Sequence, residues 1–303
     1  MNLKDMTTEQ ENPRSKELDS MPIGEALKLI NNEDKEAITA VRNVIPQIEK
    51  AVMSAVESFE NGGRLLYIGA GTSGRLGILD AAECPPTFGT DPSQVQAVIA
   101  GGEHALIKAI EGAEDDASQG RQDLEKKNLG AKDTVVGLSA SGRTPYVRGA
   151  LEYANEIGAK TVGVSCNGES VIGKTANIPI ELITGPEVLT GSTRLKAGTA
   201  QKMVLNMIST MAMVKIGKVY KNYMVDLQAT NEKLKRRAVH IVSSVTNVSM
   251  EEAEAVLVKS DNEVKTAIIA ILKHCDPETA RTMLEKTNGI VSKTLTSKEN
   301  END

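Results

Sequence analysis

The sequence predicts an α/β fold: a doubly wound five-stranded parallel sheet followed by a small C-terminal three-helix unit. Apolar strand-like runs alternate with helical stretches through the middle of the chain, as expected for a parallel sheet covered by helices on both faces. From about residue 235 the pattern changes to short helices without strands. We therefore expect an N-terminal helical segment at 1–60, a sheet domain at 61–220 and a helical unit at 235–296.

The elements follow in order along the chain. Val41, Ile45, Ile48, Val52 and Val56 recur at helical spacing and predict a long amphipathic helix before the first strand. The expected strands span 64–69, 95–100, 134–139, 161–165 and 178–183. The clearest helices between them are expected at 103–127 and 144–157.

Two loops rich in glycine and hydroxyl side chains follow the first and third of these strands. The first runs from Gly69 to Arg75 and includes Thr72 and Ser73, and both loops contain Ser-Gly-Arg. The second contributes Ser139, Ser141, Gly142, Arg143 and Thr144. Glycine permits close backbone approach, hydroxyls donate hydrogen bonds, and a following helix N-terminus favours an anion. The pair of loops therefore indicates a phosphosugar or nucleotide site, with two ordinary strand-to-helix turns as the alternative.

A long helix rich in Met, Ala and Val is expected at about 193–217, after the segment that contains Ser192. Core or subunit packing explains its methionines, and its length favours a homo-oligomer, for which we expect a homodimer. Beyond it, Ser249 and Glu252 match a capping box, which predicts a helix start. Asp276-Pro277 predicts another helix start, and Gly289 predicts a helix end. This unit is similar in length and pattern to ubiquitin-associated bundles, but we favour a role in packing on or capping the main domain over a binding role.

Composition excludes several classes of protein. The 303-residue chain has a net charge of −6, two Phe, five Tyr and no Trp, which argues against nucleic-acid binding and base stacking. The cysteines Cys84, Cys166 and Cys275 are scattered and the histidines isolated, so neither a disulfide framework nor a metal site is indicated. With a polar N-terminus and no membrane-length apolar run, we expect a cytoplasmic protein without membrane attachment.

Nucleotide-cofactor motifs are weak or absent. Gly69, Gly71 and Gly74 match the Gly-x-Gly-x-x-Gly spacing, but Thr72 and Ser73 occupy positions where a dinucleotide turn needs small, close-packing residues. The Gly-x-x-x-x-Gly-Lys-Ser/Thr pattern of a P-loop does not occur.

Two glutamates are candidates for acid–base chemistry. Glu83 precedes Pro85, which we expect to end a helix that begins near Gly74. In that last turn, the helix dipole and Asp80 would favour a protonated carboxyl, the form that a general acid needs. Glu114 follows Gly112, a predicted helix break. Taken alone, a glutamate at either position is more often a solvated surface charge than a catalytic group.

These residues lie in motifs through which the chain resembles the N-acetylmuramic acid 6-phosphate etherases. The resemblance runs from Thr8-Glu9-Gln10 and Asn12-Pro13 to the C-terminal helices, and its most specific stretches span 69–77, 80–87, 111–115, 139–145 and 190–199. The wider superfamily has the sugar isomerase (SIS) fold, a doubly wound parallel sheet that binds phosphosugars.

The resemblance implies a cofactor-free carbon–oxygen lyase of amino-sugar metabolism and peptidoglycan recycling. It cleaves the D-lactyl ether of N-acetylmuramic acid 6-phosphate, giving N-acetylglucosamine 6-phosphate and D-lactate by elimination and then hydration. It assigns Glu83 as the acid on the lactyl oxygen and Glu114 as the base at C2. The loop 139–144, with Thr72, Ser73 and Ser192, would bind the substrate phosphate and sugar.

Two other functions fit a phosphosugar-binding sheet. A non-catalytic sensor needs the phosphate loops but no acid–base pair, so the presence of both Glu83 and Glu114 argues against it. An aldose–ketose isomerase also begins with abstraction of the C2 proton. Assaying D-lactate release from muramic acid 6-phosphate separates all three functions.

Overall fold

A computed structural model of the chain describes residues 6–108, 110–227 and 232–297. The chain divides into two compact units. The first comprises Met1–Ala82 and Pro92–Thr210, and the second comprises Glu83–Asp91 and Met211–Asp303. The domain boundaries inferred from the sequence stay predictions.

A five-stranded, all-parallel sheet forms the centre of the first unit, as predicted. Its strand order is β2 (Val95–Ile99), β1 (Leu65–Gly69), β3 (Thr134–Leu138), β4 (Lys160–Ser165) and β5 (Ile178–Glu181). The first strand of the chain thus lies inside the sheet, with the second strand on one side of it and the third on the other. The winding reverses at β1, and ligands of such sheets bind at the carboxyl ends of the strands beside this reversal.

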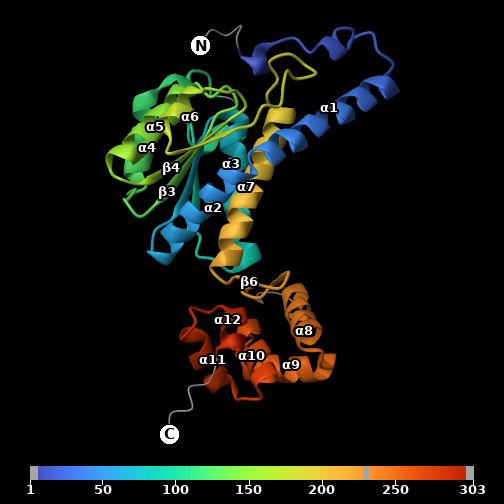
Figure 1. Cartoon of the computed structure of the whole chain (residues 1–303), viewed down its shortest axis with the longest axis vertical. Helices are drawn as coiled ribbons and strands as arrows, with labels where there is room; N and C mark the ends of the chain where they lie inside the picture. Colours follow the sequence, from blue (N-terminus) through green and yellow to red (C-terminus); the bar gives the residue numbers. More distant parts are fainter. Residues whose placement is uncertain (1–5, 109, 228–231, 298–303) are drawn as a thin grey trace. The chain divides into compact units, whose positions relative to one another are not determined.

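Helices cover both faces of the sheet (Figure 1). Leu66 and Ile68 of β1 pack into one apolar cluster with Tyr146 and Leu151 of α5 (Pro145–Glu156), which α4 (Ala117–Lys126) and α6 (Val171–Thr175) accompany. Tyr67, whose side chain points to the other face, donates a hydrogen bond to an α3 residue. α2 (Ile45–Glu60), α3 (Gly71–Phe88) and α7 (Lys196–Lys215) lie on that face. The fully buried strands need both layers of helices.

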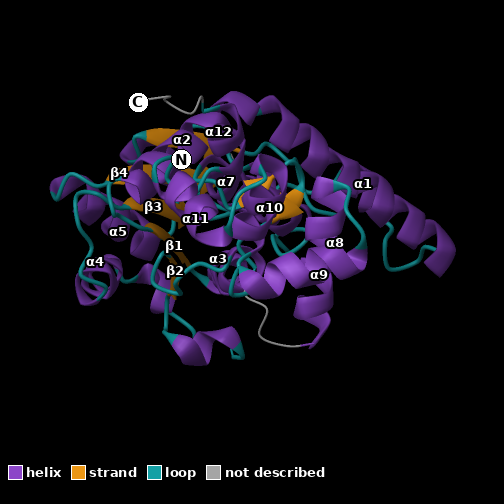
Figure 2. Ribbon diagram, turned by 90° about the horizontal axis from the view of Figure 1, so that it is seen from below, coloured by secondary structure: helices purple, strands orange, loops and turns teal. Residues whose placement is uncertain are grey.

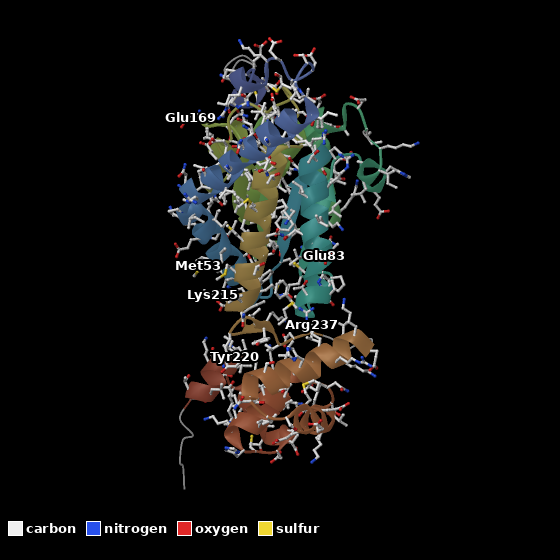
Figure 3. All side chains as sticks on the ribbon, turned by 90° about the vertical axis from the view of Figure 1, so that its right-hand side faces the viewer. Met53, Glu83, Glu169, Lys215, Tyr220 and Arg237 are labelled. Atoms are coloured by element: carbon white, nitrogen blue, oxygen red, sulfur yellow. The ribbon has the colours of Figure 1, made fainter. Side chains whose placement is uncertain are left out.

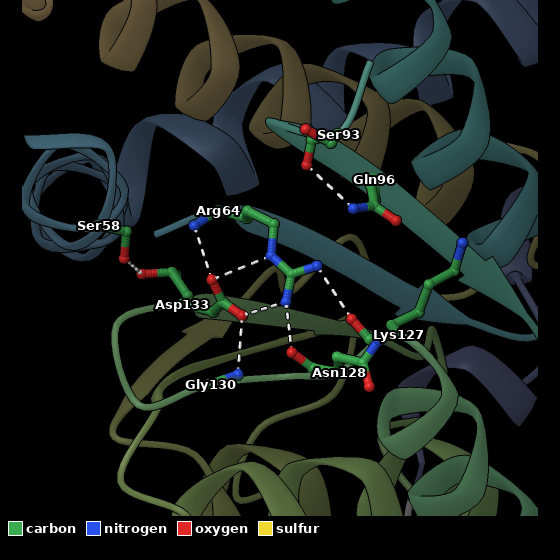
Figure 4. Close-up of polar contacts among 9 residues, drawn as sticks. Ser58, Arg64, Ser93, Gln96, Lys127, Asn128, Gly130 and Asp133 are labelled. Carbon is green, nitrogen blue, oxygen red and sulfur yellow. Dashed lines mark hydrogen bonds and ion pairs between the residues drawn. The ribbon is translucent and has the colours of Figure 1, made fainter. Parts of the chain in front are cut away.

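The amino ends of β1 and β3 are joined by a polar network at the edge of the sheet opposite the two hydroxyl-rich loops (Figure 4). The Arg64 guanidinium is 2.6 Å from Asp133 Oδ2 and also donates to the carbonyls of Lys127 and Asn128. Asp133 accepts further hydrogen bonds from the backbone N–H groups of Arg64 and Gly130. We assign this network a structural role, because it closes the ends of neighbouring strands.

The predicted helix at 41–56 is two helices in the structure. α1 (Ile23–Asn43) ends before Val44, and α2 begins at Ile45 with Pro46 in its first turn. Proline is favoured at such a position because its missing N–H would have no partner inside the helix. The apolar spacing passes through this junction and therefore did not reveal it.

The expected helix at 103–127 is wrong over its first half. Among the described residues of this stretch, α4 alone is an α-helix, and two 3-10 turns, Glu103–Leu106 and Ala113–Asp115, precede it. Gly101, Gly102 and Gly112 have positive φ, a conformation that ends a right-handed helix.

The expected end of α3 at Pro85 is also wrong, as is its expected start near Gly74. The helix runs from Gly71 through Pro85 and Pro86 to Phe88. Gly89, with φ +61°, ends it, and its N–H donates to the Pro85 carbonyl. A proline removes one donor from a helix but does not forbid the turn that follows it.

The second unit is mainly helical (purple in Figure 2) and contains its own apolar core. Besides the ends of α3 and α7, its described residues form a short antiparallel pair, β6 (Val219–Tyr220) and β7 (Tyr223–Met224), and five further helices. These are α8 (Glu232–Thr246), α9 (Met250–Lys259), α10 (Val264–Lys273), α11 (Pro277–Glu285) and α12 (Val291–Thr296). The three predicted helices are α9, α10 and α11, so the structure adds one at each end.

The local helix signals in this unit are largely confirmed. The Ser249 hydroxyl accepts from the N–H of Glu252, and Asp276 caps α11, with Pro277 as its first residue. Gly289 lies beyond the end of α11, which stops at Glu285. It has φ +70° and its N–H closes a turn onto Leu284.

Candidate functional site

The two hydroxyl-rich loops follow β1 and β3, which are neighbours in the sheet. They therefore lie at the carboxyl ends of the strands beside the reversal of the winding, where parallel sheets bind ligands. The loop after β3, residues 139–144, leads directly into α5 at Pro145.

The loop 139–144 is held in shape by its own hydroxyl groups. Ser139 Oγ lies 2.7 Å from Thr144 Oγ1 and 3.2 Å from Ser141 Oγ. The N–H groups of Gly142 and Arg143 donate to the hydroxyls of Ser139 and Ser141, respectively. An anion bound here would find several N–H and O–H donors within one turn of chain, which is the arrangement that phosphate sites use.

Gly142 is the one position of this loop where only glycine fits. Its φ is +71°, and a Cβ there would lie 2.4 Å from Ser170 Cβ and 3.0 Å from Ser165 Cβ. The loop thus approaches β4 and the start of α6 too closely for any side chain.

Asn167 supports the loop 139–144 through hydrogen bonds to its backbone, although the sequence did not single it out. Its fully buried side chain donates to the carbonyls of Ala140 (3.1 Å) and Ser141 (3.4 Å). It follows β4, the neighbour of β3, and a polar residue at the carboxyl end of a neighbouring strand is the signal that could have found it.

A cavity of about 310 Å³ opens beside this loop. Ser141, Arg143 and Thr144 line it together with Glu114, so the structure brings the predicted base and part of the predicted phosphate loop to one place. The remaining lining residues are Met6, Glu9, Asp115 and Pro145. Glu114 lies in the 3-10 turn Ala113–Asp115 and is exposed.

The loop after β1 is partly built into α3, which begins at Gly71. Ser73 is buried and its hydroxyl donates to Gln201 Oε1 on α7 at 2.8 Å, whereas Thr72 is half-buried. Ser192 lies in the loop before α7 and is also half-buried. Among the described residues, the lining of the 310 Å³ cavity does not include Thr72, Ser73 or Ser192.

Glu83 is exposed on α3 and falls in the second compact unit (labelled in Figure 3). Because α3 continues to Phe88, Glu83 is not in the last turn of the helix. The expectation that placed it at the helix end is therefore wrong.

One turn before Glu83, Asp80 anchors the helix. The Asp80 carboxylate is buried and accepts hydrogen bonds from Tyr67 Oη (2.7 Å), Asn206 Nδ2 (2.8 Å) and Ser209 Oγ (3.1 Å). These hydrogen bonds hold this part of α3 against β1 and α7.

The described residues contain no group of three or more His, Cys, Asp or Glu placed to hold a metal ion. Within the same part of the chain, no helix combines the length and the apolar character that crossing a bilayer requires.

Family models match three stretches of the chain. The SIS domain model matches residues 116–211, and the glucokinase regulatory protein N-terminal SIS domain model matches 47–155. The model of the C-terminal lid domain of glucokinase regulatory protein matches residues 221–266.

Relatives match over nearly the whole chain. The N-acetylmuramic acid 6-phosphate etherase of Geobacillus thermodenitrificans is 55% identical, covering 97% of this chain and 99% of its own. The etherase of the same name from Francisella tularensis is 54% identical over 95% of this chain and 98% of its own. A phosphoheptose isomerase from Francisella tularensis shares the fold, with a TM-score of 0.52 at 16% identity over 64% of this chain and all of the isomerase.

Proposed function

Because the chain belongs to the N-acetylmuramic acid 6-phosphate etherase family, we propose that it cleaves the D-lactyl ether of N-acetylmuramic acid 6-phosphate. The products are N-acetylglucosamine 6-phosphate and D-lactate, and the reaction belongs to cell-wall sugar recycling. The observation that carries this proposal is the identity of more than half the residues to etherases over nearly their full length. The 310 Å³ cavity supports it, since a hydroxyl-rich loop and an exposed carboxylate share its wall.

The proposed reaction is an elimination followed by a hydration, which makes the enzyme a carbon–oxygen lyase. Opening of the sugar ring exposes an aldehyde at C1, which acidifies the proton at C2. Glu114 removes that proton, the bond between C3 and the lactyl oxygen breaks, and Glu83 protonates the departing D-lactate. Water then adds at C3 of the unsaturated aldehyde.

The loop 139–144 is the proposed phosphate site. Its hydroxyl groups are hydrogen-bonded to one another. They can rotate to donate to a bound phosphate dianion, to which the backbone N–H groups of the loop also donate. Thr72, Ser73 and Ser192 are proposed as further substrate contacts. The unphosphorylated sugar should therefore be a very poor substrate. We also propose that the enzyme works in the cytoplasm, because its three cysteines are scattered along the sequence and form no paired motif.

The test separates the two glutamates. Glu83→Ala should release almost no D-lactate yet still exchange the C2 hydrogen with deuterated water, because proton abstraction precedes ether cleavage. Glu114→Ala should abolish both, and each loss should be about a hundred- to ten-thousandfold, the usual contribution of a general acid or base.

Glu111→Ala is the matched control for Glu114, since Glu111 is exposed three residues away but lies outside the cavity lining. The control should keep both activities. Exchange that is lost in Glu83→Ala and kept in Glu114→Ala would reverse the two roles. D-lactate release near the wild-type rate in either variant would remove that glutamate from the mechanism.

A further inference from the structure

The N-terminal arm, residues 6–12, forms one wall of the 310 Å³ cavity through Met6 and Glu9. We propose that Glu9 is a further substrate-binding residue, whose carboxylate accepts a hydrogen bond from a hydroxyl or amide N–H of the amino sugar. This inference rests on the proposed function, because it concerns the same cavity. The sequence named Glu9 only within Thr8-Glu9-Gln10, a stretch that carries the family resemblance, and nothing there placed it beside the loop 139–144.

The arm is hydrogen-bonded to Asn167, the residue that supports the loop 139–144. Thr7 Oγ1 donates to Asn167 Oδ1 at 3.0 Å, and Asn167 Nδ2 donates to Thr8 Oγ1 at 3.0 Å. Thr8 and Asn167 are fully buried, and Met6 is only 1% exposed. One asparagine therefore holds both the arm and the backbone of the loop 139–144, and fixes the position of one relative to the other.

A second attachment lies a few residues further along the arm. Asn12 Nδ2 donates to Glu33 Oε2 at 2.8 Å, and the same oxygen is 2.8 Å from Lys196 Nζ. Glu33 and Lys196 are both almost completely buried. Ordering a polar segment costs conformational entropy. The buried hydrogen bonds at both ends of the arm offset this cost and keep the arm ordered.

Between these attachments Glu9 remains available to a ligand. It is exposed, it lines the cavity with Glu114 and Ser141, and within the described part of the chain its carboxylate makes no hydrogen bond or ion pair. Its Oε2 would lie 3.6 Å from a Cβ on Gly191, which places it beside the loop before α7. Glu9 thus reaches from the arm to the side of the cavity that faces Ser192.

Charge decides which part of the substrate Glu9 meets. Glu9, Glu114 and Asp115 line the cavity with a single guanidinium, that of Arg143. A phosphate dianion beside the carboxylates would be repelled, whereas the N–H and O–H groups of the loop attract it. The carboxylate of Glu9 is therefore suited to the neutral sugar, whose hydroxyl and amide groups are hydrogen-bond donors.

The experiment compares a sugar phosphate with phosphate alone. Binding of N-acetylglucosamine 6-phosphate and of inorganic phosphate is measured by titration calorimetry for the wild type, Glu9→Ala and Glu9→Gln. In Glu9→Ala the dissociation constant of the sugar phosphate should rise about ten- to a hundredfold, the value of a hydrogen bond to a charged group. That of inorganic phosphate should not change. Glu9→Gln keeps a carbonyl acceptor, so the dissociation constant of the sugar phosphate should rise less in this variant.

Glu11→Ala is the matched control, because Glu11 is an exposed carboxylate of the same arm outside this cavity. It should bind both ligands like the wild type. Unchanged affinity of Glu9→Ala for the sugar phosphate would overturn the proposal. An equal loss for both ligands would also overturn it, since the arm would then act by displacing the loop. If the wild type releases no D-lactate but shows the expected binding pattern, the proposed reaction fails and the role of Glu9 stands.

Discussion

At the scale of single residues, Gly142 decides the shape of the loop 139–144. Two constraints meet at this position: a left-handed backbone, which side chains other than glycine adopt at a cost, and the absence of space for a Cβ. The turn at Gly142 also brings its N–H to the Ser139 hydroxyl, 3.0 Å away.

Gly142→Ala should therefore destabilise the protein by about 2–5 kcal/mol, the sum of a strained backbone and an overpacked contact. Gly62→Ala separates the two contributions, because Gly62 has φ +74° but open space around its missing side chain. That control should cost only about 1–2 kcal/mol. Urea unfolding followed by circular dichroism measures both changes, and equal losses in the two variants would contradict the packing argument.

At the scale of elements, a buried ion pair connects α1 with the start of α7 and the N-terminal arm. Burial by itself raises the pKa of Glu33, but hydrogen bonds from Lys196 and Asn12, with the charges of Lys196 and Arg14, hold that pKa below its usual range. Because the pKa is lowered on folding, the ionised carboxylate contributes stability above its unfolded pKa of about 4.5. That contribution is lost as the pH falls through the folded pKa.

Glu33→Gln should cost about 3–5 kcal/mol at pH 7, since it leaves the Lys196 ammonium buried without its partner. The difference in unfolding free energy between wild type and variant should narrow as the pH falls from about 4.5, the pKa of the unfolded carboxyl, through the lower pKa of the folded one. Unfolding in urea at a series of pH values checks this. Glu25→Gln, an exposed carboxylate on the same helix, should have little effect. A difference in unfolding free energy that does not change with pH would contradict the link between stability and protonation of Glu33.

At the scale of the whole molecule, the surface on which two copies could associate differs from the one inferred from the sequence. Val204, Leu205 and Ile208 of α7 are completely buried within the chain, so the apolar length of this helix is no longer an argument for a dimer. On α7 Met211 is 42% exposed, and larger exposed fractions occur on α1, where Leu27 is 59% exposed and Ile38 50%. These two residues are three helical turns apart and share one face.

We expect a homodimer in light scattering at micromolar concentration, because an exposed apolar face on a folded protein marks an association surface. The double variant Leu27→Glu, Ile38→Glu should shift the protein toward the monomer. Val258→Glu places a charge at another exposed apolar position, 64% exposed, and should leave the assembly unchanged. A monomeric wild type would refute the expectation.

Much of the architecture could be predicted because its causes are local. Apolar runs such as Thr134–Leu138 mark buried strands, and Ser249 and Asp276 cap helices through their own neighbours in the chain. The errors occurred where two local signals compete. At α3, Pro85 suggested an end, but the helix continues to the next residue with positive φ, Gly89.

The sequence by itself determined the parallel sheet, the two hydroxyl-rich loops after its first and third strands and, through the family resemblance, the candidate glutamates. Only the tertiary structure placed Glu114 and the arm residue Glu9 on one cavity with Ser141, and joined Asn167 by hydrogen bonds to both the arm and the loop 139–144. The physical reason is distance along the chain. Strand and cap signals act between near neighbours, whereas these contacts join segments that meet only after the sheet has formed, and no local pattern encodes that meeting.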